Sequence, residues 1–174
     1  MQRLQSLFIF LSILLIAGCK ERSADLDSPK SYSSEQITFQ YPGNWKVTSD
    51  NIPGNLTLET PGDAIVIVQS HPPSPDPDIT NLAKKFSEDF IAETPIGEIA
   101  VESMTELENQ AGYQRILEKF NITLLGQKIP HHRLYAGKGT ENHSFLLIFQ
   151  APSDDFEKTL TGFELILKSL QPAM

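Results

Sequence analysis

The sequence predicts an α+β domain in which helices pack on the faces of a central antiparallel sheet. Several short segments alternate apolar and polar residues, which is the two-residue period of half-buried strands. Two other segments repeat apolar residues every three or four positions, as amphipathic helices do. Clusters of Gly, Pro and Asn separate consecutive strand patterns, so neighbouring strands are expected to run antiparallel.

Length and charge limit the classes of protein to consider. The chain has 174 residues, a formal net charge of −8 and a single cysteine. This length is enough for one domain with a substantial core. An acidic chain lacks the basic surface that binds nucleic acid or anionic lipid head groups, so we expect no nucleic-acid partner. A single cysteine excludes a disulfide within the chain.

Residues 1–18 have the pattern of a secretory signal peptide. Arg3 makes the start cationic, and Leu7 to Ile16 form an apolar run that only Ser12 interrupts. The run is shorter than the roughly 20 apolar residues needed to cross a bilayer. Small residues follow it, as they do at a signal cleavage site. Cleavage before Cys19 would remove 18 of the 174 residues and leave 156.

The tetrad Ile16-Ala17-Gly18-Cys19 resembles the lipobox of bacterial lipoproteins, whose cysteine is lipidated and becomes the first residue of the mature protein. The resemblance implies that Cys19 carries fatty acyl chains such as palmitate and anchors the protein to a membrane facing the periplasm. An ordinary buried thiol in a signal anchor is the alternative. Lys20 occupies the position at which an aspartate retains many lipoproteins in the inner membrane, which favours the outer membrane.

Residues 20–34 are rich in charged residues and serine, and only Leu26 and Tyr32 are sizeable apolar side chains. Such a composition buries too little surface to offset the entropy lost on ordering. We therefore predict that residues 19–34 comprise the lipidated cysteine and a flexible tether. The folded domain is predicted to span residues 35–174.

The first part of the domain predicts an antiparallel meander. Alternating patterns, separated by turn-forming residues, occur at residues 37–41, 45–47 and 56–58. Residues 64–68 are continuously apolar, which is typical of a central strand. Residues 71–78 contain four prolines, which are excluded from helix and sheet interiors. We interpret this segment as a stiff, solvated loop, and a docking segment of polyproline type is the alternative.

A helix is predicted after the proline-rich segment, because apolar residues repeat at helical spacing until Pro95. Asp78 or Thr80 is placed to cap its start. Four longer strand patterns follow, at residues 96–107, 112–124, 128–136 and 143–150. The turns between them are expected at Gly126, at residues 137–139 and at Asn142. The last strand is apolar on both faces, so we expect it to be central and covered on both sides.

The final helix has the clearest periodicity. Ser153 is its expected cap, and Asp154 and Asp155 place negative charge at the positive end of the helix dipole. Its apolar stripe is formed by Phe156, Leu160, Phe163, Leu167 and Leu170. The largest side chains of the core are expected to be Phe39, Tyr41, Trp45, Phe145, Phe149, Phe156, Phe163 and Leu167.

Residues 39–47, Phe-Gln-Tyr-Pro-Gly-Asn-Trp-Lys-Val, resemble the opening strand, turn and strand of the PsbP-like family. This family includes the extrinsic protein of photosystem II and many bacterial envelope lipoproteins. The apolar stripe in residues 163–170 and the order of strands and helices between these ends are also similar. The resemblance spans Glu35 to Leu170 and implies a central antiparallel sheet with helices on its faces. It brings no catalytic residue to this sequence.

The sequence contains no Gly-x-Ser-x-Gly elbow and no Walker loop, so we assign no catalytic residue and do not expect an enzyme. Histidine is the residue type to consider for a metal. His131 and His132 are adjacent, so in a strand they point to opposite faces and cannot share one ion. His143, at the start of the next strand, could approach one of them, which leaves His131 and His143 as candidate ligands. We expect no tight metal site and no cofactor.

Taken together, these patterns predict a lipid-anchored cell-envelope protein that acts near the membrane as a non-catalytic binding or assembly module. Its expected partners are the membrane, through the lipid on Cys19, and an unidentified envelope protein. The alternative is a lipoprotein that binds a small ligand or a metal in a cleft beside the sheet.

Overall fold

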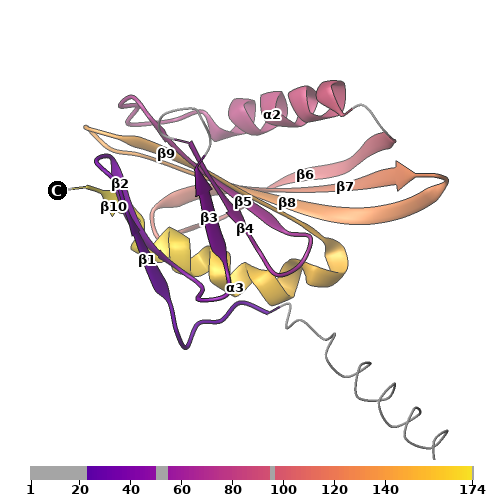
Figure 1. Ribbon diagram of the computed structural model, residues 1–174. Coiled ribbons are helices and arrows are strands. Elements are labelled where there is room, and N and C mark those ends of the chain that lie inside the picture. Colours follow the sequence, from indigo (N-terminus) through magenta and orange to yellow (C-terminus); the bar gives the residue numbers. More distant parts are fainter. Residues whose placement is uncertain (1–22, 50–54, 95–96, 174) are drawn as a thin grey trace, which may run out of the picture.

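The computed structural model describes residues 23–49, 55–94 and 97–173, which form two β-sheets and two helices (Figure 1). The larger sheet has seven strands in the order β3-β4-β5-β9-β8-β7-β6, and the smaller has three in the order β1-β2-β10. Every strand pairing in both sheets is antiparallel. The predicted α+β class, a central antiparallel sheet with helices on its faces, is confirmed.

The elements follow the predicted order of short strands, a helix, longer strands and a second helix. Their bounds are β1 Lys30–Ser33, β2 Ile37–Tyr41, β3 Lys46–Ser49, β4 Asn55–Glu59, β5 Ile65–His71, α2 Ile79–Glu93, β6 Glu98–Gln110, β7 Tyr113–Leu124, β8 Gln127–Gly139, β9 Ser144–Pro152, α3 Ser153–Ser169 and β10 Gln171–Pro172.

Strand β9 is the middle strand of the larger sheet, as its sequence predicts. It lies between β5 and β8, and residues 144–149 are all buried. Because alternate residues of a strand point to opposite faces, both faces of β9 need cover. Helix α3 covers one face and helix α2 covers the other (Figure 1).

Helix α3 packs with its predicted apolar stripe against the sheet. Phe163 is fully buried and stacks on Phe149 of β9, with 5.3 Å between the ring centroids. The helix also contacts the smaller sheet, where the backbone N–H of Gln40 donates to Ser169 Oγ at 2.9 Å. All eight expected core side chains except the half-buried Tyr41 are buried. Ser153 is the first helical residue, and the capping position belongs to Pro152.

Helix α2 approaches the other face closely, and this closeness explains a wrong turn assignment. Its buried residues are Ile79, Ala83 and Ser87. A Cβ atom on Gly137 would lie 1.7 Å from Ile79 Cδ1, so the helix occupies the space of a side chain. Gly137 therefore lies within β8, opposite Leu146, and the turn falls at residues 140–143. Glycine is required here by helix packing and not by a turn.

The opening meander is also only partly correct. Strands β3, β4 and β5 form a meander in the larger sheet. Strand β2 instead belongs to the smaller sheet, where it pairs with β1 and with β10 from the end of the chain. The turn between β2 and β3 thus carries the chain from one sheet to the other.

The flexible tether predicted up to Ser34 is wrong from Ser23 onward. Residues 30–33 form β1, which pairs along its whole length with β2. Tyr32 stacks on Phe39 of β2, with 5.1 Å between the ring centroids. Backbone hydrogen bonds to a neighbouring strand order this segment, and composition alone cannot reveal them.

Residues 23–29, hereafter the N-terminal strap, are also held against the domain. The backbone N–H of Asp25 donates to Asn44 Oδ1 at 3.0 Å. The backbone carbonyl oxygen of Asp25 accepts from the N–H of Gly43 at 2.9 Å. The N–H of Ala24 donates to the carbonyl oxygen of Lys158 in α3 at 3.3 Å. The strap therefore lies across the β2–β3 turn and α3. The signal segment, Cys19 and Lys20 lie outside the described residues.

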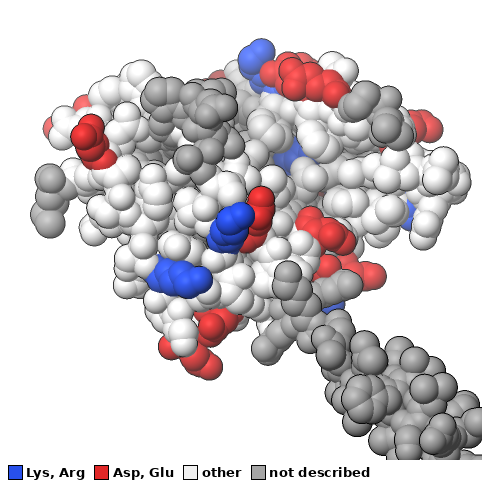
Figure 2. All heavy atoms as spheres, in the orientation of Figure 1, with Lys and Arg blue, Asp and Glu red and all other residues white. Residues whose placement is uncertain are grey.

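Surface charge and helix hydrophobicity indicate how the described residues could contact a membrane. Lys and Arg side chains are scattered over the side shown in Figure 2 and form no extended basic patch there. This agrees with the formal net charge of −8. Within the described ranges, neither helix is long and apolar enough to cross a bilayer.

Candidate functional site

A groove opens where the proline-rich segment, the start of α2 and the start of β9 meet. Its volume is about 440 Å³, and its walls are mostly apolar. The apolar walls come from Pro72, Pro77, Ile79, Leu82, Phe145 and Leu146. Polar and charged residues, among them His71, Asp78 and Lys85, also line it. We define these residues as the α2 groove.

The proline-rich wall of the α2 groove is fixed by its contact with β8. A Cβ atom on Gly139 would lie 1.8 Å from the carbonyl oxygen of Ser74, so the loop backbone crosses directly over the strand. Proline rings lack an N–H donor and restrict φ, so they give this wall a stiff apolar surface. Most of residues 71–78 are exposed, as a solvated loop should be, but Pro77 is buried.

The first turns of α2 form another wall of the groove. The start of this helix is set by a capping residue. Asp78 caps the helix, and its Oδ1 accepts a hydrogen bond from the N–H of Asn81 at 3.0 Å. One turn on, Leu82 points away from the sheet and remains 38 % exposed. The groove thus presents an aliphatic side chain that no other described element covers.

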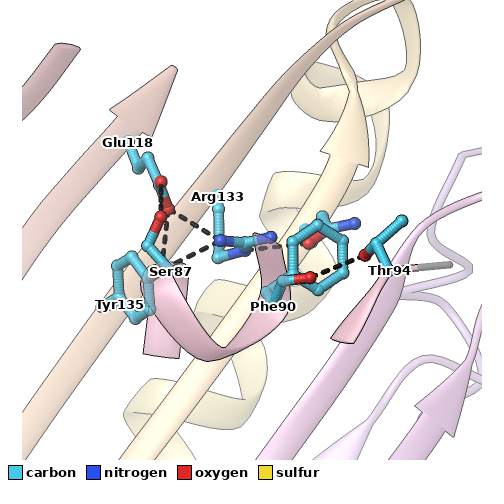
Figure 3. A network of polar contacts seen from close by, with 7 residues as sticks. Ser87, Phe90, Thr94, Glu118, Arg133 and Tyr135 are labelled. Atoms are coloured by element: carbon cyan, nitrogen blue, oxygen red, sulfur yellow. Dashed lines mark hydrogen bonds and ion pairs between the residues drawn. The ribbon is translucent and has the colours of Figure 1, made fainter. Parts of the chain in front are cut away.

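A buried network of polar and charged side chains holds α2 on the sheet (Figure 3). The Arg133 side chain of β8 is 1 % exposed and that of Glu118 of β7 is 0 % exposed, and 2.8 Å separates Arg133 Nη1 from Glu118 Oε2. Tyr135 Oη donates to the same carboxylate oxygen at 2.7 Å. Ser87 of α2 donates to the other oxygen, Oε1. Both oxygens of the buried carboxylate are therefore satisfied.

Aromatic rings surround the guanidinium group of Arg133. Its Cζ lies 4.3 Å from the ring centroid of Phe90 and 4.5 Å from that of Phe120. Cation–π contacts of this kind are worth most when the cation is desolvated. Burial raises the pKa of Tyr135, so its hydroxyl remains protonated and keeps donating. Nη2 of Arg133 is buried and has no hydrogen-bond partner among the described residues.

Sequence reasoning missed this network, although a signal was present. Glu118 stands between Ile116 and Phe120 at the two-residue spacing of one strand face, so it occupies an inward position. Arg133 likewise precedes the buried Tyr135 by two residues. Their pairing depends on the register of β7 and β8, which places Glu118 opposite Arg133. The network is enclosed and contacts α2 at Ser87 and Phe90, on the helix whose first turns line the α2 groove.

The structure separates the two candidate metal ligands. His131 lies opposite Pro152, at the end of the β8–β9 pair. His143 directly precedes β9 and therefore lies at the other end of this pair. The hairpin register thus keeps them apart, and the idea that they approach each other is wrong. Within the described ranges, no group of three His, Cys, Asp or Glu side chains is placed to hold a metal ion.

The neighbours His131 and His132 do point to opposite faces, as predicted. His131 stacks on Phe120 on the α2 side, with 5.4 Å between ring centroids, and His132 meets Phe156 of α3 edge-on at 4.9 Å. Burial lowers the pKa of both imidazoles. Nδ1 of His132 is buried and has no hydrogen-bond partner in the part of the chain that the structure describes.

The buried ion pair generates a stability prediction. Glu118→Gln removes the carboxylate charge and leaves the Arg133 cation unpaired in the interior, so we expect a loss of about 3–5 kcal/mol in the free energy of unfolding. The control is Glu59→Gln. Oε2 of Glu59 lies 3.8 Å from Nζ of Lys46 at the surface, and both side chains are more than half exposed. It should cost less than about 1 kcal/mol. Urea unfolding measures both, and equal losses would contradict the assigned role.

The two histidines generate a pH prediction. Their pKa values are lower in the folded state than the value of about 6.5 in an unfolded chain, so below that pH the unfolded chain binds more protons. The free energy of unfolding should therefore fall as the pH decreases from about 7.5 to about 5.5. The variant with both His131→Gln and His132→Gln should show a flatter dependence. An unchanged slope in this variant would contradict the prediction.

Comparisons with known proteins bear on the fold. No family model matches the chain, and no curated protein matches it in sequence. Cyanobacterial PsbP (CyanoP) from Synechocystis sp. PCC 6803 has a similar solution structure, with a TM-score of 0.54 and 14% identity over 90% of this chain and 96% of that chain. The Ran-binding protein Mog1p of Saccharomyces cerevisiae gives a TM-score of 0.51 and 9% identity over 83% and 95% of the two chains.

A crystal structure from Bacteroides thetaiotaomicron VPI-5482 is similar over 83% of this chain, with a TM-score of 0.54 and 15% identity. The chain spans about half of that protein, 48% of its length. Identities this low show a shared fold and nothing about activity. The described domain has the PsbP-like α+β fold, as residues 39–47 and the closing helix predicted.

Proposed function

We propose that this chain is a lipid-anchored protein of the bacterial cell envelope whose domain binds another envelope protein in the α2 groove and catalyses no reaction. The observation that carries the proposal is the groove itself. In many complexes a protein docks the apolar face of a helix or an extended segment in an apolar groove of its partner. The α2 groove has this character, and its exposed Leu82 offers an aliphatic contact to a partner.

Comparison with a structural relative supports a binding role. Mog1p, which shares the fold, is a Ran-binding protein. The fold is therefore compatible with protein recognition. The envelope partner is proposed from the lipobox-like tetrad that ends at Cys19, because a lipidated protein meets other membrane-held proteins at a raised effective concentration. Lys20 after Cys19 favours the outer membrane.

A small apolar ligand is the second candidate for the groove. The volume of about 440 Å³ falls within the range of roughly 300–1,000 Å³ that is typical of small-molecule sites. A ligand of this kind would be held by the same apolar walls. The two candidates are separated by what is recovered with the protein from cells.

Substitution of Cys19 tests the proposed anchor. Cys19→Ala removes the thiol that would carry the lipid, so the variant should incorporate no fatty acid and should accumulate as an uncleaved precursor. Metabolic labelling with a fatty acid, followed by gel electrophoresis, measures both effects. Equal labelling of the wild type and Cys19→Ala would exclude lipidation at this residue.

Substitution of Leu82 tests the α2 groove. Leu82 and Ile91 are both on α2 and are 38 % and 40 % exposed, but only Leu82 lines the α2 groove. Leu82→Asp should reduce recovery of a crosslinked envelope protein from intact cells by about tenfold, which corresponds to about 1.4 kcal/mol of binding free energy. Ile91→Asp is the matched control and should leave the recovery unchanged.

Loss of recovery in both variants, or in neither, would contradict binding in the groove. If no protein is crosslinked but an apolar small molecule copurifies with the wild type and not with Leu82→Asp, the small-ligand function replaces the proposed one. Thermal unfolding of both variants checks that the helix remains folded.

A further inference from the structure

We propose that the N-terminal strap orients the domain on the membrane, so that the outer surface of α3 and the β2–β3 turn face the lipid head groups. The α2 groove then faces away from the bilayer. This inference rests on the lipidation of Cys19 proposed above, and it adds the side of the molecule that the lipid surface meets.

The connection from the anchor to the folded domain is short. Ser23, the first described residue, follows Cys19 by four positions. Even fully extended, four residues reach at most about 14 Å. Ser23 is already attached to the domain, because its carbonyl oxygen accepts a hydrogen bond from Asn44 Nδ2 at 2.8 Å. The lipidated residue must therefore stay close to the β2–β3 turn.

The strap is attached at several points, so it limits rotation of the domain as well as its distance from the membrane. Ala24 is hydrogen-bonded to α3, and Asp25 is hydrogen-bonded to the β2–β3 turn. The carboxylate oxygen Oδ1 of Asp25 also accepts from the backbone N–H of Asp27 at 3.1 Å and from that of Ser28 at 3.3 Å. A Cβ atom on Gly43 would lie 2.3 Å from the carbonyl oxygen of Ser28, so strap and turn pack without a gap.

The strap and the groove lie on opposite sides of the larger sheet. The strap contacts α3, which covers the face of β8 to which His132 points. The groove borders α2, which covers the face to which Arg133 and Tyr135 point. Figure 1 shows the same arrangement, with the strap beside α3 and with α2 across the sheet. An anchor that holds α3 toward the bilayer therefore leaves the groove open to the aqueous compartment.

Charge does not cause this orientation. The strap carries Asp25 and Asp27, and the exposed charges of α3 are Asp154, Glu157, Lys158 and Lys168, with Lys46 directly after the β2–β3 turn. A surface without an excess of basic residues gains little from anionic head groups, so the short connection must supply the orientation. Leu26 of the strap is 45 % exposed, and in the proposed orientation its apolar side chain would contact the membrane interface. The orientation should therefore change little when salt screens surface charges.

Site-specific fluorescence quenching tests the orientation on the full, acylated protein. Cys19 is the only cysteine of the chain, so once it is acylated a second cysteine can be labelled alone. Thr161→Cys places a bimane label on the exposed surface of α3, and Ala92→Cys places it on the exposed surface of α2 as a matched control. The vesicles contain phosphatidylethanolamine and phosphatidylglycerol, with nitroxide-labelled head groups as the quencher.

We expect several-fold stronger quenching at residue 161 than at residue 92, with little change at high salt. A Gly-Ser insertion of twenty residues between Cys19 and Ser23 should remove most of this difference. Equal quenching at both positions, stronger quenching at residue 92, or a difference that survives the insertion would overturn the proposal. If the wild type does not float with the vesicles, the anchor and the proposed function fail. If it floats but shows no preference, only the orientation fails.

Discussion

Strand β9 is apolar on both faces, and a strand of this kind is stable in the middle of a sheet only when each face is covered. Phe149 and its neighbours on one face pack against Phe156 and Phe163 of α3. Leu146 and Ile148 on the other face pack in the cluster beneath α2. This requirement fixes two helices on two sides of one sheet. The strap then lies on the α3 side, and the groove lies on the α2 side.

The Arg133–Glu118 pair shows how α2 is placed on its face. Desolvating two charges is costly, and replacing a buried pair by apolar residues is often neutral or stabilising. We interpret the pair as a positional device, because its carboxylate accepts from Ser87 of α2 and its cation lies against Phe90 of the same helix. A helix fixed in register keeps Leu82 at the groove. The close approach of Ile79 to Gly137 adds a steric limit to the same position.

Sequence periodicity predicted most of what depends on local pattern. It located strands β2 to β9, the closing helix and the central place of β9, because these follow from the spacing of apolar residues along one segment. It did not locate β1 or β10. It did not predict the partners of β2, since β1 and β10 come from opposite ends of the domain. The strap is ordered by hydrogen bonds of its backbone, and these cannot be predicted from amino-acid composition. The buried ion pair and the separation of His131 from His143 depend on strand register, which is a long-range property.

The central claim is that the domain works by binding a partner while held at the membrane. The most direct test exports the same domain behind a cleavable signal without a lipidated cysteine, at the abundance of the wild type, in a strain that lacks the protein. The account predicts that this soluble form fails to restore the phenotype, and that anchoring by the first residues of an unrelated lipoprotein restores it. Full restoration by the soluble form would contradict the account.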